Sequence, residues 1–245
     1  MAATLNNIHV LLIHVRESAD MADHERTCIE EVSGLRPEQL TSINVAVDTD
    51  LSSVDLNDFD AVIIGGSGHH SVTRDYPFTQ PLIDAVRKMV KLRIPLLGCC
   101  WGHQFIARAL GGIVVHDPES AEVGNHEVFS TESIVDDPIF NTCPPTYLVL
   151  MGHEDRVSML PPGAIELAYS ETCRNQAFRF EDLPIYGTQF HTELTPESLL
   201  TRLRLYTKYV SDPAALDRMA ETMQPTPEAA NIILRFLKSI PNHTD

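Results

Sequence analysis

The sequence predicts an α/β fold, in which a mostly parallel, twisted sheet is flanked by helices and followed by a strand-rich second half and C-terminal helices. Three observations lead to this prediction. Short apolar runs alternate with amphipathic stretches over the first 112 residues. Short strand-like runs with Pro and Gly between them fill residues 113–190, and helical spacing returns from about Pro196. Alternating strands and helices favour parallel strands with helices on both faces.

The elements of the first half follow in order along the chain. Apolar runs of strand length lie at 8–15 (IHVLLIHV), 41–47 (TSINVAV), 60–66 (DAVIIGG) and 94–99 (IPLLGC). Helices are predicted between them at about 19–34 and 77–92, and directly after the last run at 101–112, where two glycines form a stop. A loop rich in Gly, Ser and His precedes the second helix.

The second half is predicted to be rich in strands and to end in helices. The expected strands are GIVVH (112–116), NHEVFS (125–130), TYLVLMG (146–152), IELAYS (165–170), QAFRF (176–180) and IYGTQF (185–190). Thr195, Pro196 and Glu197 form a helix start before the run that ends at residue 210, and a second helix ends at about residue 239. Because no repeat or linker interrupts the chain, we expect one domain over 1–245, with 196–245 as a helical extension.

The composition of the chain bears on its partners and its location. The chain has 245 residues, with 18 basic and 34 acidic residues and a formal net charge of -16. A dispersed acidic surface repels phosphates and anionic lipids, so neither nucleic acid nor a membrane is expected as a partner. The chain has five cysteines, an odd number, and apart from the adjacent Cys99 and Cys100 they are widely spaced. Together with an N-terminus that lacks signal-peptide features, they predict a soluble, cytoplasmic protein with free thiols.

The strand-to-helix junction at GCCWG (98–102) carries the strongest chemical pattern. A sharp turn from a buried strand into a helix needs small residues on both sides of a central nucleophile, as in the G-x-nucleophile-x-G elbow. This spacing places Cys100 at the centre. If Cys99 were central, the small positions would be occupied by Leu97 and Trp101. Cys100 is therefore the predicted nucleophile, and Cys99 is predicted to point into the packing.

The helix start supports this chemistry. A helix N-terminus and a neighbouring histidine favour the thiolate form of a cysteine. Backbone N–H groups at the same helix start, beginning with Trp101, can receive a developing oxyanion. The remaining cysteines are expected to act as small buried hydrophobes: Cys28, Cys99, Cys143 and Cys173.

The predicted base is His191, chosen from eleven histidines. It follows the apolar run at 185–190 and has Glu193 two residues later. In extended backbone, residues two apart face the same side, so the carboxylate can orient the imidazole as the third member of a triad. The other strand-end histidines are expected to have packing or hydrogen-bonding roles: His14, His116 and His153.

These stretches resemble the class I glutamine amidotransferases. PLLGCCWGHQ matches the family's G-x-C-x-G-x-Q elbow, and GTQFHTE matches G-x-Q-F-H-P-E with Thr192 in place of Pro. VIIGGSGHHSV is similar to the family's Gly-rich oxyanion strand, but Ser67 replaces a Pro and the loop is longer. MGHEDR and NQAFR are similar to segments of the branch that includes the amidotransferase part of GMP synthetase. The resemblance covers about residues 8–195 and implies the flavodoxin- or Rossmann-like sheet of that family.

The resemblance implies a Cys100–His191–Glu193 triad that attacks the γ-amide of glutamine and releases ammonia through a γ-glutamyl thioester. It also implies that Gly66 and Trp101 donate backbone N–H groups to the oxyanion and that Gln104 contacts glutamine. No cofactor and no metal is expected. Adjacent histidines in a loop at the end of a strand diverge, which argues against a metal site built from His69, His70 and His103.

Three functions remain open at this point. The chain has no G-x-x-x-x-G-K-[ST] phosphate loop, and only about fifty residues follow the triad, so it does not contain a whole GMP synthetase. A free-standing amidotransferase that supplies ammonia to a synthase partner is preferred. The alternatives are a hydrolase of γ-glutamyl peptides or conjugates and a catalytically silent regulatory module on the same fold.

Overall fold

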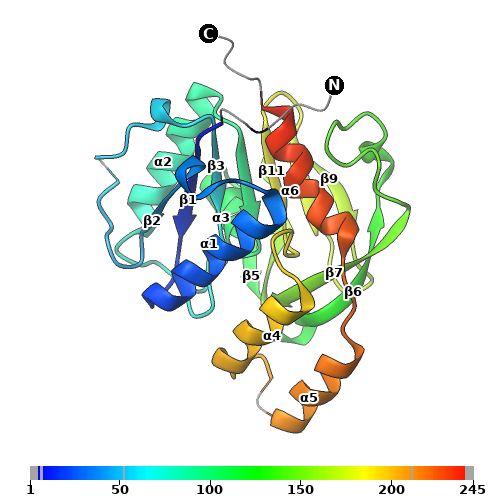
Figure 1. Ribbon diagram of the computed structural model, residues 1–245. Coiled ribbons are helices and arrows are strands. Elements are labelled where there is room, and N and C mark those ends of the chain that lie inside the picture. Colours follow the sequence, from blue (N-terminus) through cyan, green and yellow to red (C-terminus); the bar gives the residue numbers. More distant parts are fainter. Residues whose placement is uncertain (1–4, 6–7, 52, 211, 241–245) are drawn as a thin grey trace.

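The computed structural model describes residues 5, 8–51, 53–210 and 212–240, and its centre is a nine-stranded sheet in the order β2-β1-β3-β4-β11-β10-β9-β6-β7 (Figure 1). The first five strands in this order are parallel to one another. They are β2 (Leu40–Asn44), β1 (Val10–His14), β3 (Ala61–Ile64), β4 (Leu96–Cys99) and β11 (Ile185–Thr188). The predicted α/β class with a parallel sheet is confirmed.

The strand-rich half extends the same sheet in antiparallel fashion beyond β11. It consists of β10 (Ala177–Phe180), β9 (Ala164–Tyr169), β6 (Glu122–Ser130) and β7 (Thr146–His153). A separate two-stranded sheet pairs β5 (Ile113–His116) with β8 (Asp155–Met159). The strand β8 is absent from the prediction above, and the predicted strand at 41–47 ends at Asn44 because residues 45–47 form a turn.

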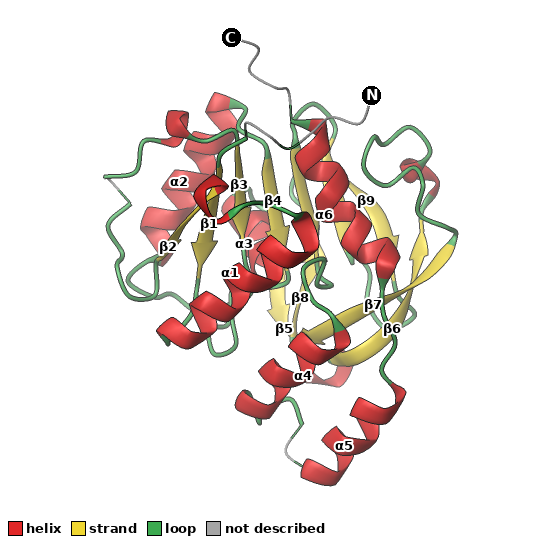
Figure 2. Cartoon of the chain, in the orientation of Figure 1, coloured by secondary structure: helices red, strands yellow, loops and turns green. Residues whose placement is uncertain are grey.

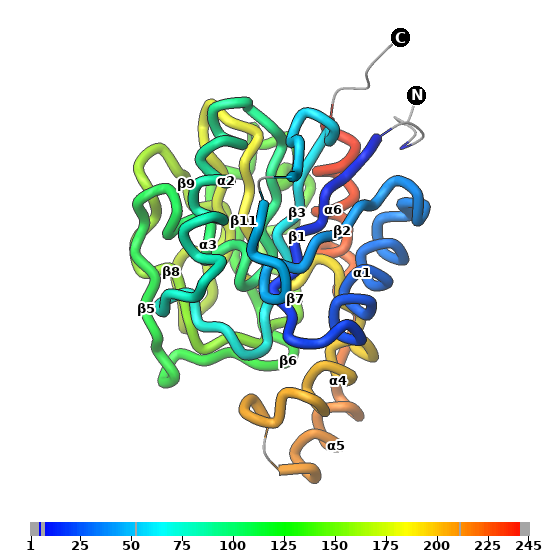
Figure 3. The backbone as a smooth tube through the Cα atoms, turned by 90° about the vertical axis from the view of Figure 1, so that its left-hand side faces the viewer, coloured from blue at the N-terminus to red at the C-terminus, as the bar shows by residue number. Residues whose placement is uncertain are grey.

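Helices cover both faces of the sheet, as predicted. Helices α1 (Ala19–Ser33) and α6 (Pro227–Ser239) lie on one face, and α2 (Thr79–Leu92) and α3 (Trp101–Ala109) lie on the other (Figures 2 and 3). The alternation of side chains along β1 divides the core in the same way. Val10 and Leu12 pack in the cluster that contains residues of α1 and α6, whereas Leu11 and Ile13 pack in the cluster that contains residues of α2 and α3.

The C-terminal extension contains one more helix than expected. Helix α4 (Pro196–Leu205) begins at the predicted cap, where Thr195 Oγ1 accepts a hydrogen bond from Ser198 N at 3.2 Å. The helix ends at Leu205 instead of residue 210, and α5 (Pro213–Thr222) follows. These two helices project from one end of the molecule (Figure 1). The assignment of residues 1–245 to one domain stays a prediction.

The topology brings the predicted motifs together. Because β3, β4 and β11 are adjacent and parallel, the segments that follow them emerge at the same edge of the sheet. These segments begin at Gly65, Cys100 and Gln189. Within the described ranges, no helix is both long enough and apolar enough to cross a membrane.

Candidate active site

Cys100 occupies a strained turn between β4 and α3. Its φ of 52° and ψ of −102° lie in a region that residues with a side chain rarely adopt. A Cβ on Gly98 would lie 2.5 Å from the carbonyl carbon of Gly102, and a Cβ on Gly102 would lie 2.1 Å from the carbonyl oxygen of Ile64. Both glycines are therefore required by the close backbone approach at the elbow.

The two adjacent cysteines face different environments. The Cys99 thiol lies 3.3 Å from Thr192 Oγ1, and burial, with a further contribution from the nearby Glu193 carboxylate, raises the pKa of that thiol far above its ordinary value. The Cys100 thiol donates to the carbonyl oxygen of Gly152 over 3.9 Å and borders a cavity. The structure thus places Cys100 toward the cavity and Cys99 in the packing.

His191 and Glu193 lie beside Cys100. His191 Nδ1 and Glu193 Oε1 are 2.8 Å apart, and both side chains are buried. The strand predicted over 185–190 ends at Thr188, and His191 forms a bridge with Leu150 of β7, whose carbonyl accepts the His191 N–H at 2.9 Å. A neighbouring strand, and not the end of its own strand, fixes the backbone of the predicted base.

Electrostatics favour a charged His191. Burial alone lowers the pKa of His191, but the Glu193 carboxylate and the Cys100 side chain outweigh burial and raise that pKa from 6.5 to about 9. Burial raises the pKa of Glu193, yet His191 and then Arg202 outweigh it and lower that pKa to about 2. The pair is therefore arranged as an imidazolium held by a carboxylate.

This arrangement predicts a pH-dependent contribution to stability. Since the folded-state pKa of His191 is about 9 and its ordinary value is 6.5, the charged pair stabilises the fold fully below pH 6.5 and loses that contribution as the pH rises through 9. The difference in unfolding free energy between the parent and His191→Asn should shrink by about 3 kcal/mol across this window. Urea unfolding of both proteins between pH 6 and 10 measures it. Parallel stability curves would contradict the assignment.

Gly66 does not offer a free N–H in the structure, in contrast to the expectation. Its N–H donates to Glu25 Oε1 at 3.0 Å. The Glu25 carboxylate is completely buried and gathers several donors, including Arg16 Nη2 at 2.5 Å and His14 Nδ1 at 2.8 Å. A buried carboxylate is stable only when it is paired in this way, and here the N–H of Gly66 is one of its partners.

The roles predicted for Trp101, a backbone donor to the oxyanion, and for Gln104, a contact to glutamine, both stay predictions. Trp101 is the first residue of α3, so its N–H has no acceptor within the helix. Gln104 Nε2 donates to the carbonyl oxygen of Asp155 at 2.7 Å and to Gln189 Oε1 at 3.0 Å. Gln189 Nε2 in turn donates to the Cys100 thiol over 3.7 Å. Gln104 thus positions Gln189, a residue for which no role was predicted.

A cavity of about 170 Å³ opens beside Cys100. His153 lines it, but its ring nitrogens face Glu122 Oε2 at 3.0 Å and the carbonyl oxygen of Asp155 at 3.1 Å. This agrees with a hydrogen-bonding role for His153. The rest of the lining includes the elbow, Gln104 and the loop after β3: Ser67, His69, His70, Ser71, Arg74, Tyr76, Cys100, Trp101, Gln104, His116, Gly152, Glu154, Asp155, Lys208 and Tyr209.

The two histidines of the long loop after β3, His69 and His70, both lie against the carboxylate of Glu17. Nδ1 of His69 and Nδ1 of His70 each lie 3.1 Å from Glu17. His103 is fully buried against Phe178, where burial lowers its pKa to about 3. The three histidines do not converge, and the described residues contain no group of His, Cys, Asp and Glu arranged to hold a metal ion.

Comparisons with known proteins agree with this geometry. The family model described as "Glutamine amidotransferase class-I" matches residues 31–203. One subunit of the glutamine-hydrolyzing GMP synthase from Methanothermobacter thermautotrophicus is 34% identical over 160 residues, which cover 65% of this chain and 79% of that protein. The glutamine-hydrolyzing GMP synthase from Thermosipho africanus is 38% identical over 138 residues, and the match covers 56% of this chain and 25% of that protein. The chain thus spans about a quarter of that synthase.

Solved structures with the same fold cover nearly the whole chain. A glutamine amidotransferase from Thermotoga maritima superposes with a TM-score of 0.71 at 25% identity, over 94% of this chain and 96% of that one. A glutamine amido transferase from Methylobacillus flagellatus gives the same TM-score at 22% identity over 97% of both chains, which supports the fold alone.

Proposed function

Because this chain belongs to the class I glutamine amidotransferases, we propose that it hydrolyses the γ-amide of glutamine to glutamate and ammonia. The observation that carries the proposal is the placement of Cys100 at the strained elbow, facing a cavity and beside the His191–Glu193 pair. A nucleophile, a base and a carboxylate that orients the base are the groups that acyl transfer through a thioester requires.

The proposed reaction has two stages. The Cys100 thiolate attacks the γ-carbonyl carbon, and the N–H of Trp101 stabilises the resulting oxyanion. The imidazolium of His191 gives its proton to the departing nitrogen, so ammonia leaves and a γ-glutamyl thioester remains. His191 then takes a proton from water, which attacks the thioester and releases glutamate. Glu193 holds the imidazole in orientation through both stages and is not consumed.

We propose further that the ammonia passes to a synthase partner. The name of the matched relative from Methanothermobacter thermautotrophicus supports this proposal, because it is named as one subunit of a glutamine-hydrolyzing GMP synthase. The described cysteines are all free and buried, which supports a reducing, cytoplasmic location.

The substrate is tested by kinetics on the purified chain. Glutamine and several γ-glutamyl peptides are each supplied, and ammonia, glutamate and the released amine are quantified. We expect equal amounts of ammonia and glutamate from glutamine, and a kcat/KM for glutamine above that for the peptides. A higher kcat/KM for the peptides would assign the chain as a γ-glutamyl hydrolase. A dedicated supplier is expected to be slow alone and faster with its synthase.

Covalent labelling of Cys100 distinguishes an active enzyme from a catalytically silent regulatory module. A diazoketone analogue of glutamine should alkylate Cys100 of the parent, as mass spectrometry of the peptides would show. The Cys100→Ala protein is the control and should stay unmodified. A parent that neither releases product nor takes the label would leave the regulatory module as the correct description.

A further inference from the structure

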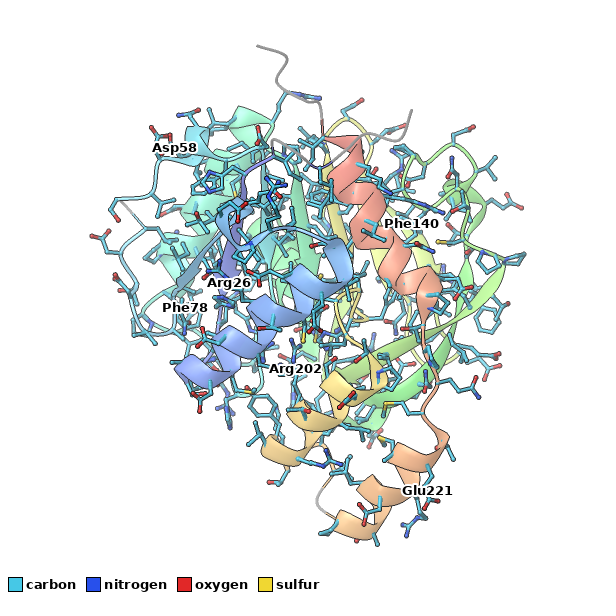
Figure 4. The ribbon with its side chains drawn as sticks, in the orientation of Figure 1. Arg26, Asp58, Phe78, Phe140, Arg202 and Glu221 are labelled. Atoms are coloured by element: carbon cyan, nitrogen blue, oxygen red, sulfur yellow. The ribbon has the colours of Figure 1, made fainter. Side chains whose placement is uncertain are left out.

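Arg202 is a buried arginine directly behind the triad that no sequence motif singled out. It lies on α4, on the side that faces α1 and the sheet, and its residue is 4% exposed (Figure 4). Arg202 Nη1 donates to Glu193 Oε1 at 3.1 Å, and Nη2 lies 3.8 Å from Glu25 Oε1. We infer that Arg202 is a positioning residue that fixes Glu193, and through it His191; this inference rests on the proposed hydrolysis of glutamine.

The local structure explains why the guanidinium reaches this point. The chain passes from Glu193 to the Thr195 cap and directly into α4. Leu199 and Leu203 share the buried face of α4 with Arg202, because residues three and four apart lie on one side of a helix. The packing of these leucines sets the depth at which the arginine side chain enters the protein.

The hydrogen bonds of Glu193 make its orientation depend on Arg202. One oxygen, Oε1, accepts hydrogen bonds from both His191 Nδ1 and Arg202 Nη1. The other oxygen, Oε2, has no hydrogen-bond partner among the described residues. The terminal torsion of a glutamate side chain is broad. With Arg202 in place, the oxygen that faces His191 is held from both sides. Without Arg202, only the imidazole restrains the carboxylate.

Charge balance allows the fold to bury an arginine at this position. Arg16 and Arg202 face the carboxylates of Glu25 and Glu193 in one buried group, and the imidazolium of His191 meets the same Glu193 carboxylate. The other hydrogen-bonding nitrogens of Arg202, Nε and Nη2, make no hydrogen bond within the described part of the chain. Among the described residues, the one hydrogen bond of Arg202 therefore goes to the triad carboxylate.

The test compares Arg202→Gln with Arg204→Gln, a matched control on the exposed face of the same helix. Arg202→Gln should lower kcat for glutamine roughly 10-fold to 100-fold, within the coupling range of contacting residues. KM should change less than about twofold, because Arg202 acts through Glu193 and does not touch substrate. Arg202→Lys keeps the charge and should restore part of kcat. Arg204→Gln should behave as the parent.

A double-mutant cycle separates positioning from a general loss of structure. Arg202→Gln made in the Glu193→Gln background should lower kcat by less than about twofold, because the carboxylate that it positions is already altered. Equal fold losses in the two backgrounds would overturn the inference. If Arg202→Gln fails to fold, Arg202→Lys takes its place in the test. A kcat of Arg202→Lys equal to that of Arg204→Gln would also overturn the inference.

A second readout does not depend on the proposed substrate. The rate of Cys100 alkylation by iodoacetamide at neutral pH, resolved by peptide, reports the thiolate that His191 supports. Arg202→Gln should slow this alkylation about tenfold in the parent and little in the Glu193→Gln background. If the parent releases no ammonia from glutamine but this pattern holds, the proposed function fails and the positioning inference stands. Unchanged alkylation would overturn the inference.

Discussion

Cys100→Ala is expected to abolish hydrolysis of glutamine, with a loss of about six orders of magnitude in kcat, the size seen when the nucleophile of a triad is removed. Alanine cannot form the thioester, and no other thiol takes its place. The neighbouring Cys99 points to Thr192, on the other side of the strand end. Ammonia release and mass spectrometry of the acyl-enzyme measure the effect.

Cys99→Ala is the matched control for this substitution. Cys99 behaves as a small hydrophobe in the core, so its replacement should cost about 1 kcal/mol of stability and leave most of the activity. An active Cys100→Ala protein would refute the nucleophile. A glutamine-analogue label found on Cys99 would do the same.

His191→Asn is expected to have the second largest effect, with a loss in kcat approaching that of the nucleophile, because the thiol then loses its base. Glu193→Gln should cost less, about four orders of magnitude, because the carboxylate orients the imidazole and does not itself react. The structure gives the reason for this ranking. His191 lies between Cys100 and Glu193, and Glu193 meets only the far nitrogen of the ring.

His153→Asn serves as the control for the base. His153 also borders the cavity, but its ring is held by Glu122 and by the carbonyl oxygen of Asp155. We expect its replacement to affect stability more than kcat. A greater loss of kcat in His153→Asn than in His191→Asn would show that the wrong base had been assigned.

Local patterns in the sequence predicted most elements of the fold. The apolar runs that became β1, β3, β4 and β11 are short, strongly apolar and bounded by loop residues, and their ends fall within a few residues of the prediction. The strand β8 was missed because Asp155 and Arg156 interrupt its apolar character. Helix α5 was missed because only Leu216 of its residues is buried, so it lacks a wide apolar face.

The residues of the candidate site likewise fall into those that the local sequence predicted and those that it did not. The elbow and the His191–Glu193 pair lie within short segments, so their spacing, together with the resemblance of these segments to the amidotransferase motifs, was enough to predict them. Glu25 and Arg202 come from α1 and α4, and their buried meeting depends on how those helices pack. A charged residue on a helix is normally solvated, so nothing in the local sequence indicated that these would be buried. The same packing explains why the N–H of Gly66 is taken by Glu25.

The position of β11 in the sheet has a consequence for how the protein assembles. This strand lies between β4 and β10, yet it comes late in the chain, at Ile185–Thr188. Until it is synthesised, a nascent chain holds two incomplete sheets with unpaired edges, which are templates for aggregation. Joining β4 to β11 closes a long loop, and such non-local pairing makes folding slow. The nucleophile and its base therefore come together only once β11 has paired with β4. A chain cut before residue 185 would expose both edges and would also lack the Thr188 carbonyl oxygen that accepts the Cys100 N–H at 2.7 Å.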